Sequence, residues 1–168
     1  MAAGVLGAEI RASDPEELRY VVLRPLVDRY AAEKGIEATP DAVESYIDHM
    51  RAFLEKEGIA QEEDSPEDAA ARRDIAAAFI RQWKVNGALY QQYGGRIIFQ
   101  QGGPEPLDAY RRFLEEAQAR GDLEILDKGL EEAFWKYYRD DSIHSFFEPG
   151  SKEEADAFAA PPWERDPG

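Results

Sequence analysis

The chain has 168 residues, of which 35 are acidic and 20 basic, so its formal net charge is −15 and its isoelectric point is about 4.5. This balance argues against nucleic acid as a partner, which favours a basic face, and against docking on anionic membranes. The absence of cysteine excludes disulfides, thiol catalysis and thiolate metal sites.

The chain opens with MAAGVLGAEI, which lacks the basic region and the apolar region of a signal peptide. We therefore expect a cytoplasmic protein, or a periplasmic or exported one if a leader has been removed. No apolar run along the chain approaches the roughly 20 residues that a membrane-spanning helix needs. We expect no membrane insertion.

Helix caps and apolar residues at helical spacing predict two helices in the first third of the chain. The first begins behind the N-cap Ser13 and ends at Gly35, and the second begins behind Thr39 and ends at Gly58. The residues expected to face inward in the first helix are Leu18, Val22, Leu26 and Tyr30. Those of the second helix are Val43, Ile47, Met50 and Leu54.

A third helix is predicted over 66–93, after an acidic linker, with Ser65 before its first turn. Its inward stripe is expected to contain Ile75, Phe79, Trp83, Asn86 or Gly87, and Tyr90. The run RIIFQ at 96–100 is expected to be extended or in a turn. A fourth helix follows GPEP, with its inward residues expected to be Leu107, Tyr110 and Leu114.

A short extended piece is expected near 122–126, then a fifth helix capped by Asp127 and a short last helix behind Ser151. The stripe of the fifth helix is expected to be Leu130, Phe134 and Tyr137, widened by Trp135 and Tyr138. These elements predict a mainly α fold: one helical-bundle domain over 1–160, with about five to six helices and short extended segments. An irregular C-terminal tail is expected over 161–168.

Residues 79–104 form an acid-free window, because they contain no Asp or Glu in a strongly acidic chain. The window also holds the single Asn and five of the seven Gln residues. Amides both donate and accept hydrogen bonds, and aromatic faces offer apolar contact. A groove lined in this way suits an extended polypeptide. The residues that we expect to line it are Trp83, Asn86, Tyr90, Tyr93, Arg96, Gln100 and Gln101.

Two other interpretations of the window stand beside this one. In the first, the window is only the core of a helical bundle, which loses its charges because buried charges are costly. In the second, a small ligand or an enzyme substrate binds at Arg96, Glu105 and His144. The two histidines, His49 and His144, are not spaced as metal ligands. We therefore expect no metal site. We also expect no cofactor and no catalytic residue.

The layout of residues 5–50, VLGAEIRASDPEELRYVVLRPLVDRYAAEKGIEATPDAVESYIDHM, resembles the N-terminal region of the SurA-like, parvulin-associated periplasmic chaperones. A short extended piece precedes a helix with a central apolar segment, and IEATPDAVESYI is similar to the sequence motif that comes next in that family. The resemblance covers about a third of the chain. The prolyl-isomerase domain that usually follows has no strand-rich counterpart here, and the block YGGRIIFQQGGPEPLDAY has no counterpart in the classical members.

The resemblance implies a chaperone-like domain without isomerase activity. Such relatives bind unfolded or extended polypeptide segments rich in apolar and aromatic residues without ATP, and they are exported. No catalytic residue carries over from them to this chain.

Overall fold

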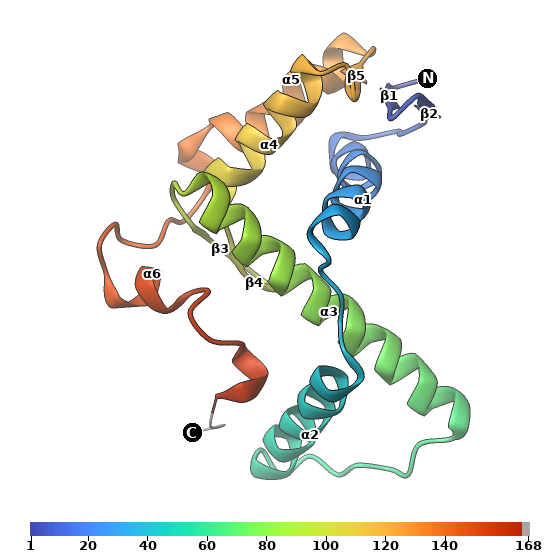
Figure 1. Cartoon of the computed structure of the whole chain (residues 1–168), viewed down its shortest axis with the longest axis vertical. Coiled ribbons are helices and arrows are strands. Elements are labelled where there is room, and N and C mark those ends of the chain that lie inside the picture. The colour runs from blue at the N-terminus through green and yellow to red at the C-terminus, as the bar shows by residue number, and fades with distance from the viewer. Residues whose placement is uncertain (166–168) are drawn as a thin grey trace.

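The chain folds into a mainly α structure, which confirms the predicted fold class; the computed structural model describes residues 1–165 (Figure 1). The helices of the described part are α1 (Pro15–Lys34), α2 (Pro40–Lys56), α3 (Pro66–Tyr93), α4 (Leu107–Ala119), α5 (Lys128–Arg139) and α6 (Lys152–Asp156). Short 3-10 turns follow at Asp141–Ile143 and Pro162–Glu164. None of the described helices is long and apolar enough to cross a membrane.

Short antiparallel strands connect segments that are far apart in the sequence. β1 (Ala3–Val5) pairs with both β2 (Ala8–Ile10) and β5 (Leu123–Ile125), so the start of the chain is joined to the connection between α4 and α5. β3 (Ile98–Gln100) and β4 (Gly103–Glu105) form a hairpin directly after α3. This hairpin carries the second half of the acid-free window.

Side-chain caps begin five of the helices in the described chain. Thr39, Ser65, Asp127 and Ser151 accept backbone N–H groups at the starts of α2, α3, α5 and α6, as predicted. The predicted cap of α1 is wrong by one residue, because Asp14, and not Ser13, accepts from the Glu17 amide. The Glu17 carboxylate accepts from the backbone N–H and the hydroxyl of Ser13, so Ser13 contacts the first turn of the helix without being its cap.

The larger core lies where α1, α4, α5 and the second half of α3 meet the sheet formed by β1, β2 and β5. The predicted inward residues of α1 and α4 are buried there, which confirms both stripes: Leu18, Val22, Leu26, Tyr30, Leu107, Tyr110 and Leu114. On α5 the buried residues are Phe134, Trp135 and Tyr138, whereas Leu130 and Tyr137 are half-buried. The buried face of α5 is therefore turned slightly from the predicted one.

The predicted stripe of α3 is wrong in its first half. Ile75 is 65% exposed and Phe79 is 43% exposed, while the neighbouring Ala76 and Ile80 are fully buried. The cause is the length of α3, which has 28 residues and packs against α2 along its first half and α4 along its second. Because these neighbours lie on different faces, one stripe cannot describe the whole helix.

A smaller core joins α2 and α3 to the C-terminal end of the described chain. It is built from Val43, Ala76, Ile80 and Trp163. The predicted stripe of α2 is only partly buried, since Met50 is exposed and the residues of α2 that pack here lie in its first half. The tail predicted as irregular contains the 3-10 turn at Pro162–Glu164; residues 166–168 lie outside the described chain.

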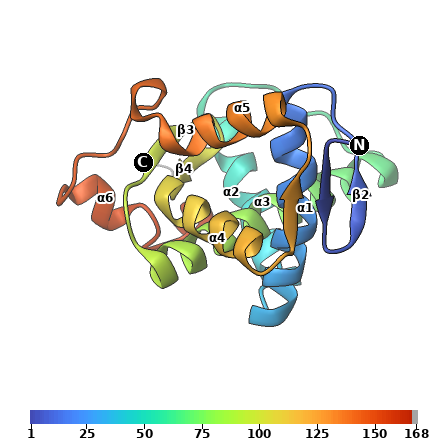
Figure 2. The ribbon, with the colours of Figure 1, turned by 90° about the horizontal axis from the view of Figure 1, so that it is seen from above.

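The larger core and the core of α2 and α3 lie toward opposite ends of the molecule and are connected by α3. A third small cluster is formed by Ile97, Phe147 and Ala157, with Tyr90 and Phe158 packed against it. Figure 1 shows α1, α4, α5 and the N-terminus at one end, and α2 with the C-terminal end of the chain at the other. Seen from above, α6 lies on the side opposite the β1–β2 hairpin (Figure 2). The acid-free window, on the second half of α3 and the hairpin after it, therefore faces several different neighbours.

Candidate functional site

Trp83 and Tyr90 of α3 are covered by the C-terminal segment, residues 157–165. The Phe158 ring lies between them, with its centroid 5.4 Å from that of Tyr90 and 6.5 Å from that of Trp83. Trp163 packs edge-on against Trp83 at 5.4 Å. These distances are typical of stabilising aromatic pairs. A piece of polypeptide that is outside any α-helix thus occupies part of the surface that the sequence predicted for a peptide.

The same contacts continue past Trp163 to residues that no segment of the described chain fully covers. Tyr46 of α2 lies 6.1 Å from Trp163 and 5.8 Å from Phe79, which is exposed. One helical turn separates Phe79 from Ile75, and one turn separates Tyr46 from the exposed Met50. We name the rings from Tyr90 through Phe158, Trp83, Trp163 and Tyr46 to Phe79 the aromatic row. Its Phe79 end is open to solvent.

Two hydrogen-bond donors in the covered part of the aromatic row have no acceptor within residues 1–165. The indole Nε1 atoms of Trp83 and Trp163 are buried and have no hydrogen-bond partner among the described residues. A buried donor without an acceptor costs roughly 1–3 kcal/mol. The C-terminal segment therefore covers the tryptophans without supplying the carbonyl oxygens that both of them need.

Asn86 points away from the row, into a cluster of polar side chains between α3 and α4. Its Oδ1 accepts from Gln82 Nε2 at 2.8 Å and from the Tyr110 hydroxyl, and its Nδ2 donates to the Pro104 carbonyl at 3.4 Å. Gln82 Nε2 also donates to Tyr110 Oη at 2.8 Å. Asn86 thus has its hydrogen bonds made within the protein.

The two glutamines of the β3–β4 hairpin have different surroundings. Gln100 donates to Tyr137 Oη at 2.8 Å, and Tyr137 in turn donates to Glu105 at 2.8 Å. Gln101 lies exposed in the hairpin turn. Burial raises the pKa of Glu105 above its ordinary value, against the lowering effects of the Tyr137 hydrogen bond and of the Arg19 charge.

Arg96 forms an ion-pair cluster that fixes the end of α3 to the start of α4. Its guanidinium donates to Asp108 at 2.9 Å and to Asp141 at 2.9 Å, and it lies 4.4 Å over the Phe146 ring. Its backbone N–H also donates to Asp108. Burial acts to raise the pKa of Asp108, but the hydrogen bonds and charge of Arg96 outweigh it, and the net pKa is lowered.

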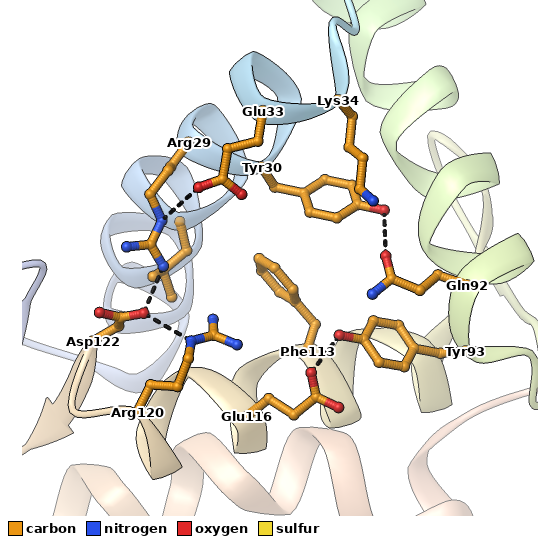
Figure 3. A pocket seen from close by; sticks show the side chains of 11 residues that line it. Arg29, Tyr30, Glu33, Lys34, Gln92, Tyr93, Phe113, Glu116, Arg120 and Asp122 are labelled. Atoms are coloured by element: carbon orange, nitrogen blue, oxygen red, sulfur yellow. Dashed lines mark hydrogen bonds and ion pairs between the residues drawn. The ribbon is translucent and has the colours of Figure 1, made fainter.

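Tyr93 lines a cleft of about 420 Å³ between α1, α3 and α4 (Figure 3). Its hydroxyl donates to Glu116 at 2.6 Å, and burial followed by this bond raises the pKa of Tyr93 to about 12. Across the cleft, Tyr30 donates to Gln92 at 2.9 Å, and Arg29 pairs with Asp122 at 2.6 Å. Figure 3 shows these pairs joining the three helices around the cleft. The polar groups of this cleft mainly bond one another.

The predicted site residues therefore separate onto several surfaces. Trp83 and Tyr90 share the aromatic row, whereas Asn86, Tyr93 and Arg96 each have other partners. The residues of the alternative site, Arg96, Glu105 and His144, are only partly connected. His144 Nε2 lies 2.5 Å from the backbone oxygen of Tyr137, whose hydroxyl bonds Glu105. The clefts that Glu105 lines contain neither Arg96 nor His144.

The sequence interpretation missed four rings of the row. Phe79 was expected in the inward stripe of the third helix, and Tyr46, Phe158 and Trp163 were assigned no role, so none was considered as a binding residue. Aromatic residues at the end of a very acidic chain were the available signal, because solvated tails rarely contain Trp.

The described residues include no group of three or more His, Cys, Asp or Glu side chains that could hold a metal ion. Comparison of the chain with protein-family models, with curated proteins and with solved structures finds no significant match in any of the three.

Proposed function

We propose that this domain holds extended polypeptide segments rich in aromatic and apolar residues, without ATP, as a chaperone-like binding domain. The segment would lie along the aromatic row and continue over its open Phe79 end. The N-terminal resemblance to SurA-like chaperones supports the same kind of client. An exported or periplasmic location, which the resemblance implies, belongs to this proposal.

The observation that carries the proposal is the way in which residues 157–165 bind the row. Phe158 and Trp163 are five residues apart and insert between rings of α2 and α3, while the backbone between them is not a regular helix. This surface thus accepts irregular polypeptide with spaced aromatic side chains. A client segment with the same spacing could continue the contacts past Trp163 or replace them.

The open end of the row offers further apolar surface. Ile75 and Phe79 on α3 and Met50 on α2 are exposed, and Phe53 is exposed about one turn further along α2. Exposed apolar patches of this kind mark interaction sites in monomeric proteins. Burying Phe79 and Ile75 under a client would contribute only part of the roughly 1.5–3 kcal/mol that full burial of such a side chain gives, since they are 43% and 65% exposed.

The charges around the open end specify the client further. Residues 40–75, which comprise α2, the linker 57–65 and the start of α3, carry eleven acidic and four basic residues. Opposite charge across an interface raises the association rate and suppresses wrong partners. We therefore infer a client segment that combines aromatic residues with Lys or Arg.

Binding of a fluorescent synthetic peptide tests the proposal. The peptide carries Trp and Phe five residues apart, with Arg and Lys between them, and its anisotropy is measured with the chain in the absence of nucleotide. The test variant is Ile75→Ser/Phe79→Ser, whose changed side chains are exposed and outside both cores. The matched control is Leu126→Ser/Ile143→Ser, which removes exposed apolar side chains that are not part of the row.

We expect the wild type and the control to bind alike, and the test variant to bind at least tenfold more weakly. Added ATP and Mg²⁺ should leave all three affinities unchanged. Equal binding by the test variant, or no binding by the wild type at millimolar concentration, would contradict the proposal.

A further inference from the structure

A different part of the molecule, around Glu105, forms a cleft between α1 and α3. The cleft has a volume of about 450 Å³, in the range typical of small-molecule sites. Leu23 and Val27 of α1 and Val85 of α3 supply apolar walls. A smaller cleft of about 190 Å³ adjoins it. Both are lined by Gln82, Glu105 and Tyr110, which therefore lie at their junction.

Glu105 forms no ion pair within the described residues. The Tyr137 hydroxyl donates to its carboxylate at 2.8 Å, and the Gln100 side chain also acts on it as a hydrogen-bond donor. The Arg19 guanidinium is close enough to act on it, but it lies 3.8 Å over the Tyr137 ring instead of pairing with the carboxylate. Buried charges in proteins are normally paired, because an isolated buried carboxylate is costly. Glu105 thus has no cationic side chain at ion-pair distance among the described residues, although much of its surface is covered.

The groups beside Glu105 have used their donors and present acceptors. Both hydrogens of Gln82 Nε2 are engaged, one with Asn86 and one with Tyr110, so the Gln82 Oε1 atom remains as an acceptor. Tyr110 donates its hydroxyl hydrogen to Asn86, and Tyr137 donates its own to Glu105. The junction therefore offers acceptors to a ligand and few donors.

We infer that this cleft binds a primary ammonium group carried on an apolar stem. The ammonium brings three donors and one positive charge, which match the Glu105 carboxylate and the Gln82 and Tyr110 oxygens. The stem would lie against Leu23, Val27 and Val85. The source is either a free small amine or the side chain of a lysine, since the two share this chemistry.

The rim of the cleft is compatible with such a ligand. Its Arg81 is paired with Asp28 at 2.8 Å, across the mouth between α3 and α1. Arg24 donates to the exposed Tyr20 hydroxyl at 3.4 Å. Both cations thus have partners among the other residues that line the cleft.

Isothermal titration calorimetry with two probes tests the inference. The probes are 2-phenylethylamine, a free amine, and Nα-acetyl-lysine amide, a lysine side chain, and 2-phenylethanol is the uncharged isostere. Glu105→Gln removes the charge and keeps the shape. Ala78→Leu fills the cleft from an exposed helical position, with Ala70→Leu as the same exposed change elsewhere on α3.

We expect at least one amine to bind the wild type and Ala70→Leu, with the alcohol at least tenfold weaker. Glu105→Gln and Ala78→Leu should each weaken the amine at least tenfold. If only one of the two amines binds, that result shows whether the ammonium group comes from a free amine or from a lysine side chain. Because Glu105→Gln removes a buried charge, its unliganded melting temperature should not fall, which separates lost binding from lost folding.

Absence of binding by both amines at 10 mM, equal binding of the alcohol, or unchanged binding by Glu105→Gln would overturn the inference. The Ile75→Ser/Phe79→Ser variant should bind the amine as the wild type does, since the aromatic row and this cleft share no residue. This result keeps the ammonium site separate from the polypeptide proposal.

Discussion

Glu105 and Asp108 are three residues apart, yet their surroundings shift the two pKa values in opposite directions. Glu105 is half-buried beside tyrosines, and its burial raises its pKa. Asp108 is also buried, but Arg96 bonds it through both its side chain and its backbone, and its pKa falls. The environment, and not the residue type, decides the charge that each carboxyl favours.

The raised pKa of Glu105 makes a prediction about stability and pH. A group whose pKa is raised on folding contributes stability that is present below its unfolded pKa and is lost as the pH rises through the folded pKa. The Gln side chain of the Glu105→Gln variant does not titrate, so the variant lacks this pH-dependent contribution. We expect it to be more stable than the wild type at pH 7.5, with the difference shrinking toward pH 4.5. The charged and titratable groups that act on Glu105 are Arg19, Tyr137 and His144, together with Tyr110 and Tyr138.

Urea unfolding at the two pH values measures this difference. A Glu105→Gln variant that loses more stability at pH 7.5 than at pH 4.5 would show that the carboxylate is stabilised in the fold, against the direction given by its burial.

Gly95 makes a second prediction at the scale of one residue. Its φ is +88°, and a Cβ built there would lie 2.5 Å from the Cβ of Asp108. Gly121 has a similar φ of +79° but open space around it. Gly121→Ala should cost about 1–2 kcal/mol for the left-handed backbone alone. Gly95→Ala should cost about 1–3 kcal/mol more, because it also overpacks the start of α4.

Denaturant unfolding of both glycine variants checks this comparison. Equal losses would mean that α4 can move away from the new methyl group at no cost, and that the Arg96–Asp108 contact is looser than its geometry indicates.

At the scale of elements, the sequence predicts helix positions well because caps and breakers are local. The span of α3 matches the predicted 66–93, and its capping box uses Ser65 and Asp68. The face that each helix buries is less predictable, since it depends on neighbours brought from elsewhere in the chain. Ile75 and Phe79 look like core residues in the sequence and are exposed in the structure.

The candidate site shows the same limit. The acid-free window identifies Trp83 and Tyr90, but it does not reveal that they contact Phe158 or that Asn86 turns toward α4. Partners separated by about 70 residues leave no periodic signal in one sequence. The sequence interpretation named Glu105 as part of an alternative site, but with Arg96 and His144; the cleft it lines was missed for the same reason, because its lining comes from α1, α3, β4 and α4.

Trp163 gives a prediction about the C-terminal segment as an element. Its ring is 5% exposed and packs in the smaller core, but its Nε1 has no acceptor. Trp163→Phe keeps an aromatic ring and removes the unpaired donor, so it should change the free energy of unfolding by less than about 1 kcal/mol. Trp163→Ala should cost about 3 kcal/mol, because it leaves a cavity against α2 and α3.

The same two variants connect stability to binding. Trp163→Ala uncovers Trp83, so we expect it to bind the aromatic peptide more tightly than Trp163→Phe despite its lower stability. Denaturant unfolding and peptide anisotropy on the same samples measure both effects. Weaker peptide binding by Trp163→Ala would indicate that the C-terminal segment helps to form the site instead of covering it.

For the whole molecule, the net charge of −15 shapes which partners approach. The acidic surface of α2 and the start of α3 surrounds the open end of the aromatic row. Long-range attraction between exposed charges is screened over about 8–10 Å at physiological salt. We expect an Arg- and Lys-containing peptide to lose affinity between 50 and 500 mM NaCl. A Gln-substituted peptide with the same aromatic residues should change little, and equal salt dependence of the two would exclude a role for the acidic surface.

The most direct measurement of polypeptide binding at the aromatic row is site-specific photo-crosslinking. p-Benzoylphenylalanine replaces Phe79 in one sample and Ile143 in another, since both positions are exposed and only the first lies on the row. The labelled aromatic peptide is then irradiated with each sample without nucleotide. We expect crosslinking from position 79 and little from position 143. Equal crosslinking at both positions, or none at position 79, would contradict the assignment of this surface as the binding site.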